Sequence, residues 1–428
     1  MYRSSYNIEL AIDENKSIIF NSFSRKFIVF SSKFSNQYNE ILNNPNEFIK
    51  IPEYAIFIKD LISGGFIIRD RGEQLKYIKK EQKLKNDKSN LCFTIYTTLD
   101  CNYKCWYCVQ NHKKIQLGSD MQNSIIKLIE NKCQDDKIKR VSISWFGGEP
   151  FLNLDAITRI SKALITTCIK NNIEYNCDFT TNASLINEDI IDTISPFNVT
   201  SFQITIDGSK TFHNKTKFNL EQNDAFDTTL NAIVVLANRL PKTDIFVRIN
   251  YSGNNILDSF VDEIDQYLYS VKDKIYVFFR KIWQINETWD IRLKIRDIMI
   301  KLKNRGYNIV HDFDHLGLIN CISEHENYYS IFPNGAVSKC ANVDINTANG
   351  QLLPDGTIKL NHEDLIIHSV TDNCNNCKYF PICLGPCPRE RIKQHQSEVA
   401  LCKFDNDSVH EYFKNEILNY YYLNCESK

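Results

Sequence analysis

The 428-residue sequence lacks several features that would assign it to a membrane, to secretion or to nucleic acid. No apolar run approaches the ~18 residues that a transmembrane helix needs. The N-terminal segment has neither the basic start nor the apolar stretch of a signal peptide. Its 51 Lys and Arg residues are balanced by 52 Asp and Glu residues, so no large positive charge is available to attract nucleic acid. We therefore expect a cytoplasmic protein without a membrane or nucleic-acid partner.

Cysteine, in contrast, is abundant, with 15 residues in the chain. In a reducing compartment, clustered cysteines indicate metal binding or catalysis rather than disulfides. The apolar fraction of 43% and the charged fraction of 24% are ordinary for a globular protein. At this length, the chain is expected to form two to four domains.

The first part of the chain predicts a small domain of strands and helices. Residues 6–31 alternate apolar and polar residues around a turn, which favours short antiparallel strands. Helical patterns follow at 33–43 and 53–63, and 66–69 has the pattern of a strand. This order is the outline of a winged-helix domain. The lysine-rich stretch 76–88 predicts a solvated helix that links this domain to the next.

From residue 91 onward, strand-like and helical segments alternate. The six β-rich runs are 92–98, 141–146, 175–182, 201–207, 244–251 and 274–282. The helical segments that follow them are 120–133, 155–171, 187–195, 224–239, 255–270 and 289–305. This alternation predicts an α/β fold with a parallel sheet, either a barrel or a doubly wound sheet. After residue 320 we expect irregular, cysteine-rich structure and a last helix at 407–421.

The first cysteine group, Cys101, Cys105 and Cys108, directly follows the first parallel strand. A parallel barrel places its active site in such loops. A four-iron cluster with full protein ligation needs four cysteines, so three would leave one iron open. The alternative is a zinc site, for which His112 is available as the fourth ligand.

The CxxxCxxC spacing, with Tyr107 before its last cysteine, resembles the radical S-adenosylmethionine (radical SAM) enzymes. Three further segments resemble family motifs and occur in family order at the ends of successive strands. They are Gly147-Gly148-Glu149-Pro150, Thr180-Thr181-Asn182 and Thr205-Ile206-Asp207-Gly208. The resemblance covers residues 91–285 and implies a partial (β/α)6 barrel over residues 90–285.

The resemblance also implies the cofactors and their ligands. A [4Fe–4S] cluster on Cys101, Cys105 and Cys108 would accept an electron from a donor such as flavodoxin or ferredoxin. It would cleave S-adenosylmethionine, and the resulting 5′-deoxyadenosyl radical would remove hydrogen from the substrate. The implied cofactor-binding residues are Tyr107, Gly147, Gly148, Glu149, Asn182, Thr205, Lys217 and Arg248. Lys217 stands where the family usually has Arg, and Arg248 on the fifth strand is the alternative grip on the cofactor carboxylate.

The second cysteine group resembles the SPASM extension of radical SAM enzymes that act on peptides and proteins. Its members are Cys321, Cys340, Cys374, Cys377, Cys383, Cys387 and Cys402. The resemblance implies two auxiliary [4Fe–4S] clusters, hence three clusters in all. One auxiliary cluster would use Cys374, Cys377, Cys383 and Cys402, and the other would use Cys321, Cys340 and Cys387.

The second of these auxiliary clusters lacks a cysteine that fully ligated relatives carry. His325, Glu324 or Glu326 could replace it, the cluster could be smaller, or the open iron could bind a substrate thiolate. We favour the open site. The other cysteines of the chain, such as Cys133 and Cys177, are expected to pack as small hydrophobic residues.

These features together predict a peptide maturase. A winged-helix domain before a radical SAM–SPASM core resembles the leader-recognition domains of enzymes that modify ribosomally made peptides, where the leader adds as a strand to a sheet edge. Residues 1–90 hold only 15 Lys and Arg against 11 Asp and Glu, which disfavours DNA binding. The expected domains are a leader-binding domain (1–85), the barrel (90–285), a bridging helix (286–320) and the SPASM domain (321–428).

The expected product is a crosslink, preferably a thioether, with a carbon–carbon or ether link as alternatives. A sulfatase-maturing enzyme that makes formylglycine is the other enzymatic alternative. Those enzymes tend to carry Asp after the second SPASM cysteine, whereas Ala341 follows Cys340 here. A non-enzymatic electron carrier is disfavoured by the intact cofactor-binding motifs.

Overall fold

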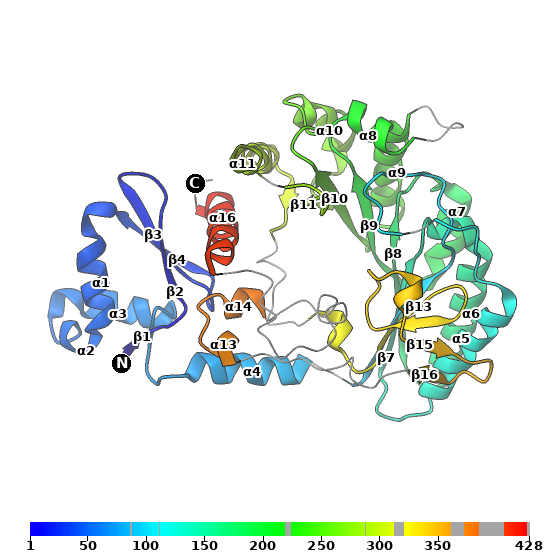
Figure 1. Ribbon diagram of the computed structural model, residues 1–428, viewed down its shortest axis with the longest axis horizontal. Coiled ribbons are helices and arrows are strands. Elements are labelled where there is room, and N and C mark those ends of the chain that lie inside the picture. Colours follow the sequence, from blue (N-terminus) through cyan, green and yellow to red (C-terminus); the bar gives the residue numbers. More distant parts are fainter. Residues whose placement is uncertain are drawn as a thin grey trace. The chain divides into compact units, whose positions relative to one another are not determined.

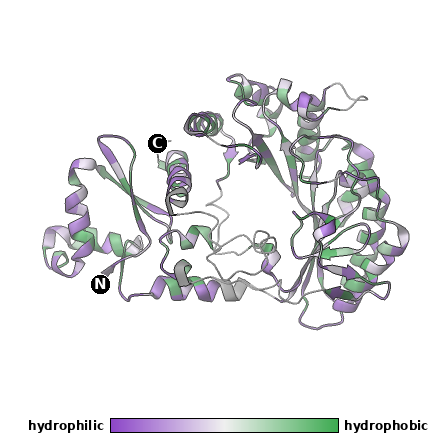
Figure 2. Cartoon of the chain, in the orientation of Figure 1, coloured by the Kyte–Doolittle hydropathy of each residue, from purple (hydrophilic) through white to green (hydrophobic). Residues whose placement is uncertain are grey.

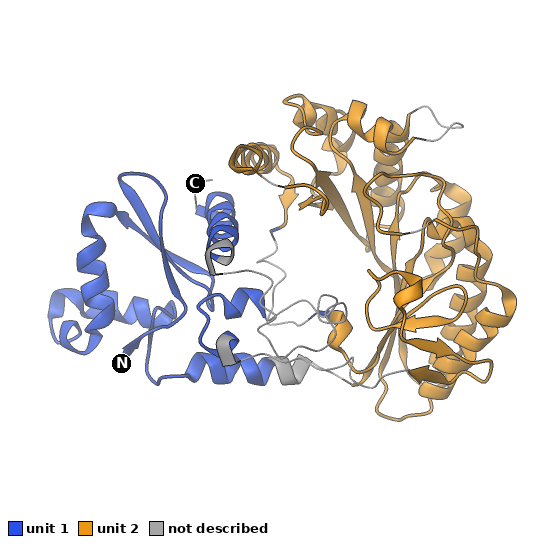
Figure 3. Cartoon of the chain, viewed as in Figure 1, with its two compact units in different colours: residues 1–86, 311–321, 367–428 blue, residues 87–310, 322–366 orange. Residues whose placement is uncertain are grey.

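The computed structural model describes residues 1–85, 88–110, 112–218, 224–286, 288–311, 321–360, 372–384 and 406–425. The chain divides into two compact units (Figure 1, Figure 3). Unit 1 comprises residues 1–86, 311–321 and 367–428, and unit 2 comprises residues 87–310 and 322–366. The predicted bridge and the predicted C-terminal extension therefore each contribute to both units. No helix in the described ranges is long and apolar enough to cross a membrane.

Unit 2 is built on a parallel sheet whose six central strands follow one another in chain order. They are β6 (Asn90–Tyr96), β7 (Arg140–Phe146), β8 (Glu174–Thr181), β9 (Val199–Ile206), β10 (Asp244–Tyr251) and β11 (Ile275–Lys281). Each pairs in parallel with its neighbours, and the short β12 (Asn308–Ile309) pairs with β11. The predicted (β/α)6 sheet is thus confirmed, with strand ends within about two residues of those expected.

Helices connect these strands as the alternation predicted. They are α5 (Ser119–Lys132), α6 (Leu154–Lys170), α7 (Glu188–Ile194), α8 (Lys210–Thr216), α9 (Ala225–Arg239), α10 (Phe260–Leu268) and α11 (Trp289–Asn304). Figure 1 shows α5, α6 and α7 along one side of the sheet. In Figure 2 these helices carry both hydrophobic and hydrophilic residues, as expected for helices with one face on a sheet and one face in water. The short α8 was not predicted.

The expectation of irregular structure after residue 320 was wrong in part. Four strands extend the sheet beyond β6: β13 (Tyr328–Ile331), β14 (Ala336–Ser338), β15 (Gly350–Leu352) and β16 (Ile358–Leu360). β13 pairs in parallel with β6, and the next three strands continue as antiparallel hairpins. These strands have three or four residues each, too few for a clear alternation in the sequence.

Unit 1 contains the predicted order of strands, helices and strand. Its N-terminal elements are β1 (Tyr2–Arg3), β2 (Asn7–Ala11), β3 (Lys16–Asn21), β4 (Lys26–Ser31), α1 (Ser35–Asn43), α2 (Pro45–Phe48), α3 (Pro52–Ser63), β5 (Ile67–Ile68) and α4 (Glu73–Lys85). β2, β3 and β4 form an antiparallel sheet, and β1 pairs with β5. The C-terminal elements are α13 (Asp372–Asn375), α14 (Phe380–Cys383) and α16 (Asn406–Cys425).

Both faces of the three-stranded sheet of unit 1 are covered. Because side chains alternate along a strand, Ile19 and its neighbour Ile18 on β3 point to opposite faces. Ile19 packs with residues of α1 and α3, such as Ile41 and Ile58. Ile18 packs with α16. A sheet with two apolar faces needs a helix on each, and the C-terminal helix covers the second face.

Candidate active site

A pocket of about 380 Å³ lies in unit 2, beside the C-terminal ends of the parallel strands. Cys101, Cys105 and Cys108 all line it. Seven of the eight predicted cofactor-binding residues line it as well: Tyr107, Gly147, Gly148, Asn182, Thr205, Lys217 and Arg248. Residues at or near the C-terminal ends of β7, β8, β9, β10 and β11 thus surround the three cysteines. Parallel barrels place their active sites at this end of the strands.

Burial favours the protonated form of all three thiols. Desolvation raises the pKa of Cys101 to about 12, although the backbone N–H of Tyr103 donates to its Sγ at 3.4 Å. Burial also raises the pKa values of Cys105 and Cys108. The charge of Lys217 acts in the opposite direction on all three thiols. A cation is therefore already in place to stabilise thiolates once a metal cluster displaces their protons.

The donor set fits a four-iron cluster with one open iron. Three soft sulfur ligands border one pocket, and the pocket leaves room for a cofactor beside them. The zinc alternative needs His112 as a fourth ligand beside the three thiols. His112 contacts only one of the thiols, with its Nε2 at 3.3 Å from the Sγ of Cys108.

A buried network of hydrogen bonds fixes the rear of the pocket. The Tyr107 hydroxyl donates to Asp207 Oδ1 at 2.5 Å, and Asn250 donates from Nδ2 to both partners at 3.0 Å. Lys217 Nζ lies 3.5 Å from Asp207 Oδ2. Burial opposes ionisation of Asp207, but Lys217 and its other partners hold its pKa below the usual range. Burial opposes the charge of Lys217, but Asp207 together with the neighbouring Cys105 and Cys101 outweighs it and raises the pKa of Lys217.

Lys217 and Arg248 place two cations at the pocket. Arg248 donates from Nε to Asn250 Oδ1 at 2.9 Å, which orients its guanidinium. Two cations suit a cofactor that carries a carboxylate, and only Arg offers a planar fork for it. Lys217 already has a carboxylate partner in Asp207. Arg248 is thus the better placed of the two for a carboxylate of the cofactor.

Glu149 does not line the pocket. Its carboxylate is fully buried and accepts hydrogen bonds from the Thr181 hydroxyl at 2.8 Å, the Asn182 N–H at 2.8 Å and the Phe151 N–H at 3.2 Å. Burial raises the pKa of Glu149 to about 7. The part of Glu149 in cofactor binding stays a prediction. Its hydrogen bonds tie the end of β7 to the end of β8.

The two glycines after β7 allow two loops to pack without space between them. A Cβ on Gly148 would lie 2.0 Å from the carbonyl oxygen of Asp100, and a Cβ on Gly147 would lie 2.5 Å from that of Thr98. Gly147 also has a φ of 151°, which L side chains rarely adopt. Both glycines thus hold the β7 loop against the backbone that carries Cys101.

Gly148→Ala is expected to lower the rate of S-adenosylmethionine cleavage by about 100-fold, because the added methyl group must displace the Cys101 loop by an ångström or more. The measurement is 5′-deoxyadenosine formation by reduced, reconstituted protein, together with iron per chain. Gly118→Ala is the matched control, since a Cβ there meets nothing within 4 Å. Wild-type rates in Gly148→Ala would contradict the close packing of the two loops.

Sequence reasoning missed several residues of the pocket. Asn250, Gln203, Lys281, Gln284 and Asn342 line it but belong to none of the motifs. One signal was available: Gln203 lies two residues before Thr205 on β9, and Asn250 two residues after Arg248 on β10. Residues two apart on a strand share a face, so these side chains were expected to point with the predicted ones.

The structure describes five of the seven C-terminal cysteines. Cys374, Cys377 and Cys383 lie in or beside α13 and α14 of unit 1. Cys321 belongs to unit 1 and is exposed, whereas Cys340 belongs to unit 2 and is buried. The predicted ligands Cys387 and Cys402 lie outside the described residues. The assignment of these cysteines to two auxiliary clusters stays a prediction.

Comparison with known proteins assigns the barrel to a family. Residues 95–260 match the family model of the Radical SAM superfamily. The chain is 25% identical over 400 residues to the radical SAM cyclopropyl synthase TigE of Paramaledivibacter caminithermalis. This alignment covers 80% of this chain and 78% of that protein. It is also 23% identical over 359 residues to a cysteine-type anaerobic sulfatase-maturating enzyme of Clostridium perfringens. That alignment covers 73% of this chain and 92% of that protein.

Solved structures give the same fold. The structure of anSMEcpe with bound AdoMet and the Cp18Cys peptide superposes with a TM-score of 0.58 at 20% sequence identity, covering 78% of this chain and 97% of that chain. The predicted radical SAM fold is therefore confirmed.

Proposed function

Because this chain carries a radical SAM domain and is a radical SAM enzyme, we propose that it forms a crosslink in a ribosomally made precursor peptide. The observation that carries the proposal is the pocket shared by the three motif cysteines and the strand-end residues. When bound, the cluster and S-adenosylmethionine supply a 5′-deoxyadenosyl radical that removes hydrogen from an unactivated carbon of the peptide. The protein holds and orients these groups and excludes water.

The residues of the chain divide this work among them. Cys101, Cys105 and Cys108 would hold the cluster and leave one iron open to the cofactor. Arg248 would orient the cofactor's carboxylate. The ion pair of Lys217 with Asp207 keeps a positive charge near the thiolates. The hydrogen bonds of Tyr107 to Asp207 and Asn250 fix the cysteine loop to the ends of β9 and β10.

The reaction is tested first without a peptide. Reduced, reconstituted protein is expected to convert S-adenosylmethionine into methionine and 5′-deoxyadenosine, with dithionite or a flavodoxin or ferredoxin as electron donor. Chromatography measures both products. A reconstituted protein that binds iron at the three motif cysteines but forms no 5′-deoxyadenosine would contradict the proposal, and an electron carrier or binding module would then be the better interpretation.

We propose that the C-terminal cysteines hold two auxiliary [4Fe–4S] clusters, in the sets predicted from the sequence. Lys339 lies directly before Cys340, one of the predicted ligands. Its buried Nζ donates to the carbonyl oxygens of His325, Glu326 and Tyr328 at 2.7 to 2.9 Å. These bonds fix the segment that contains His325, the alternative fourth ligand. If the imidazole of His325 does not bind iron, the open iron is available to a substrate thiolate, which favours a thioether product.

Two other products have support among the relatives. The similarity to a cyclopropyl synthase supports carbon–carbon bond formation. The similarity to sulfatase-maturating enzymes supports formylglycine. Mass spectrometry of a peptide co-expressed from a neighbouring short reading frame separates the three. Formation of a thioether or of a carbon–carbon bond lowers the peptide mass by two hydrogens. Of these two products, only the thioether blocks alkylation of a cysteine. Formylglycine formation from cysteine removes the sulfur.

Unit 1 offers a place for the leader of such a peptide. Among the described strands, β4 pairs with β3 alone, so one of its edges is open to a further strand. Val29 on β4 and Phe34 just after it are 41% and 43% exposed. An extended peptide that pairs with β4 would cover these apolar side chains. We therefore propose β4 as the leader-binding edge.

Val29→Asp is expected to lower peptide modification about tenfold, since a charge on this edge loses apolar contact and adds a desolvation cost. Cleavage of S-adenosylmethionine without peptide is expected to stay unchanged, because the pocket lies in unit 2. The modified fraction of co-expressed peptide is the measurement. Ile169→Asp is the control, since Ile169 is 76% exposed on α6 of unit 2. Equal modification by both variants would remove β4 from the proposal.

A further inference from the structure

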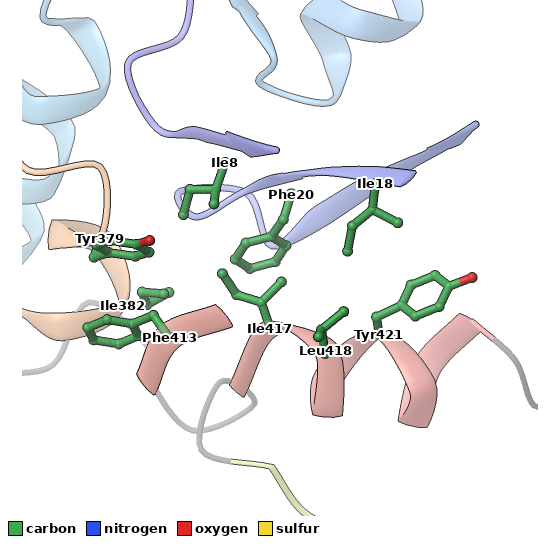
Figure 4. Close-up of a cluster of buried hydrophobic side chains, with 9 residues drawn as sticks. All are labelled: Ile8, Ile18, Phe20, Tyr379, Ile382, Phe413, Ile417, Leu418 and Tyr421. Carbon is green, nitrogen blue, oxygen red and sulfur yellow. The ribbon is translucent and has the colours of Figure 1, made fainter. Parts of the chain in front are cut away.

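The three-stranded sheet of unit 1, β2 to β4, shares one hydrophobic core with residues 372–384, here called the cysteine segment. Ile8, Ile18 and Phe20 on β2 and β3 point toward Ile417 and Tyr421 of α16 (Figure 4). The cysteine segment adds Tyr379 and Ile382 to the same cluster, and Phe413 completes it from α16. The ring of Tyr379 stacks on that of Phe413 with centroids 4.8 Å apart.

The cysteines themselves pack against this core. Cys377 and Cys383 contact the cluster around Phe20. Cys374 and Cys377 contact a second cluster, formed by Tyr6, Ile78 and Phe380. A hydrogen bond from the Ser22 hydroxyl to the carbonyl oxygen of Lys378, at 2.6 Å, ties the end of β3 to the backbone between the cysteines. Cys377 and Cys383 thus pack against residues of the sheet proposed to bind the leader, and Cys374 packs on the second cluster.

The cysteine segment has little secondary structure to keep it in place. α13 and α14 have four residues each, which is far below the length at which a helix is stable by itself. Its position must therefore come from its contacts with the sheet and from any metal cluster that binds its thiols. A metal cluster that joins three thiols adds its binding free energy to the stability of the segment, because the unfolded chain does not hold those thiols together.

We propose that iron–sulfur loading at Cys374, Cys377 and Cys383 completes the core of unit 1 and thereby orders the sheet that recognises the peptide. This rests on the proposed function, which assigns a cluster to these cysteines and leader binding to this sheet. The cluster then has a structural part in substrate recognition. Each thiol loses its proton on binding iron, and no electron transfer is required.

Hydrogen–deuterium exchange of the full chain, without peptide or S-adenosylmethionine, tests the proposal. Loading the wild-type protein with iron and sulfide is expected to slow amide exchange in β2 to β4 about fivefold or more. The Cys101→Ala/Cys105→Ala/Cys108→Ala variant is expected to show the same slowing, because it keeps the cysteines of unit 1. An unchanged exchange rate in loaded wild-type protein would overturn the proposal.

Two single variants assign the effect to the named cysteines. Cys377→Ala is expected to lose the slowing and about four irons per chain. Cys425→Ala is the matched control, since Cys425 is exposed at the end of α16 and belongs to no predicted cluster. Slowing in Cys377→Ala equal to that in Cys425→Ala would overturn the proposal. A failure of the proposed function would show separately, as absent 5′-deoxyadenosine in the same wild-type sample.

Discussion

Replacing Cys101, Cys105 and Cys108 together by alanine is expected to abolish formation of 5′-deoxyadenosine. The three side chains line one pocket, and the triple variant leaves none of these thiolates there to hold the irons. About eight irons per chain should remain, on the count of two four-iron auxiliary clusters. Iron analysis and chromatography of the cleavage products measure both effects.

The control for this variant is a wild-type sample reconstituted in parallel, with Cys425→Ala as a cysteine substitution outside every predicted cluster. Both should cleave S-adenosylmethionine at equal rates. Cleavage that persists in the triple variant would show that the radical cluster lies elsewhere. A loss of all iron, in contrast, would show that the auxiliary clusters do not assemble independently of the first.

The barrel could be predicted from the sequence because its signals are local. Each of the six central strands, β6 to β11, has seven or eight residues, and each is followed by at least one helix. Chain order then equals strand order, from β6 to β11. The site followed from the same rule: motif residues at strand ends had to meet, and seven of the eight predicted cofactor-binding residues do line one pocket.

The parts that could not be predicted depend on contacts between distant segments. Nothing in the residues of α16 specifies that Ile417 packs on Phe20, almost four hundred residues earlier, because many apolar faces fit one another equally well. Glu149 is a similar case. Its motif identifies it as important, but only the structure shows that its carboxylate is occupied by Thr181 and Asn182.

The shared core of unit 1 also changes how leader binding should be tested. Deletion of residues 1–85 would remove Ile8, Ile18 and Phe20, and would expose the apolar face of α16 and the cysteine segment to water. A loss of peptide modification would then have two causes. A surface substitution such as Val29→Asp leaves this core intact and separates recognition from stability.

Lys217→Met is expected to lower the stability of unit 2 by about 3–5 kcal/mol, the cost of leaving a buried charge without its partner. The side chains of Lys217 and Asp207 are 4% and 1% exposed, and their charged atoms lie 3.5 Å apart. All four tryptophans, Trp106, Trp145, Trp283 and Trp289, belong to unit 2. Urea unfolding of metal-free protein, followed by tryptophan fluorescence, therefore reports on this unit.

Lys210→Met is the matched control for the loss of a lysine. Its Nζ also contacts aspartates, Asp224 and Asp227 at 2.7 Å, but its side chain is 41% exposed. Solvent screens such a pair, so the loss should be about 0–1 kcal/mol. The double variant Lys217→Met/Asp207→Asn should recover much of the stability, because it removes the unpaired charge as well. If Lys217→Met and Lys210→Met lower the free energy of unfolding equally, the buried pair does not stabilise the pocket, and Lys217 is free to bind the cofactor carboxylate in place of Arg248.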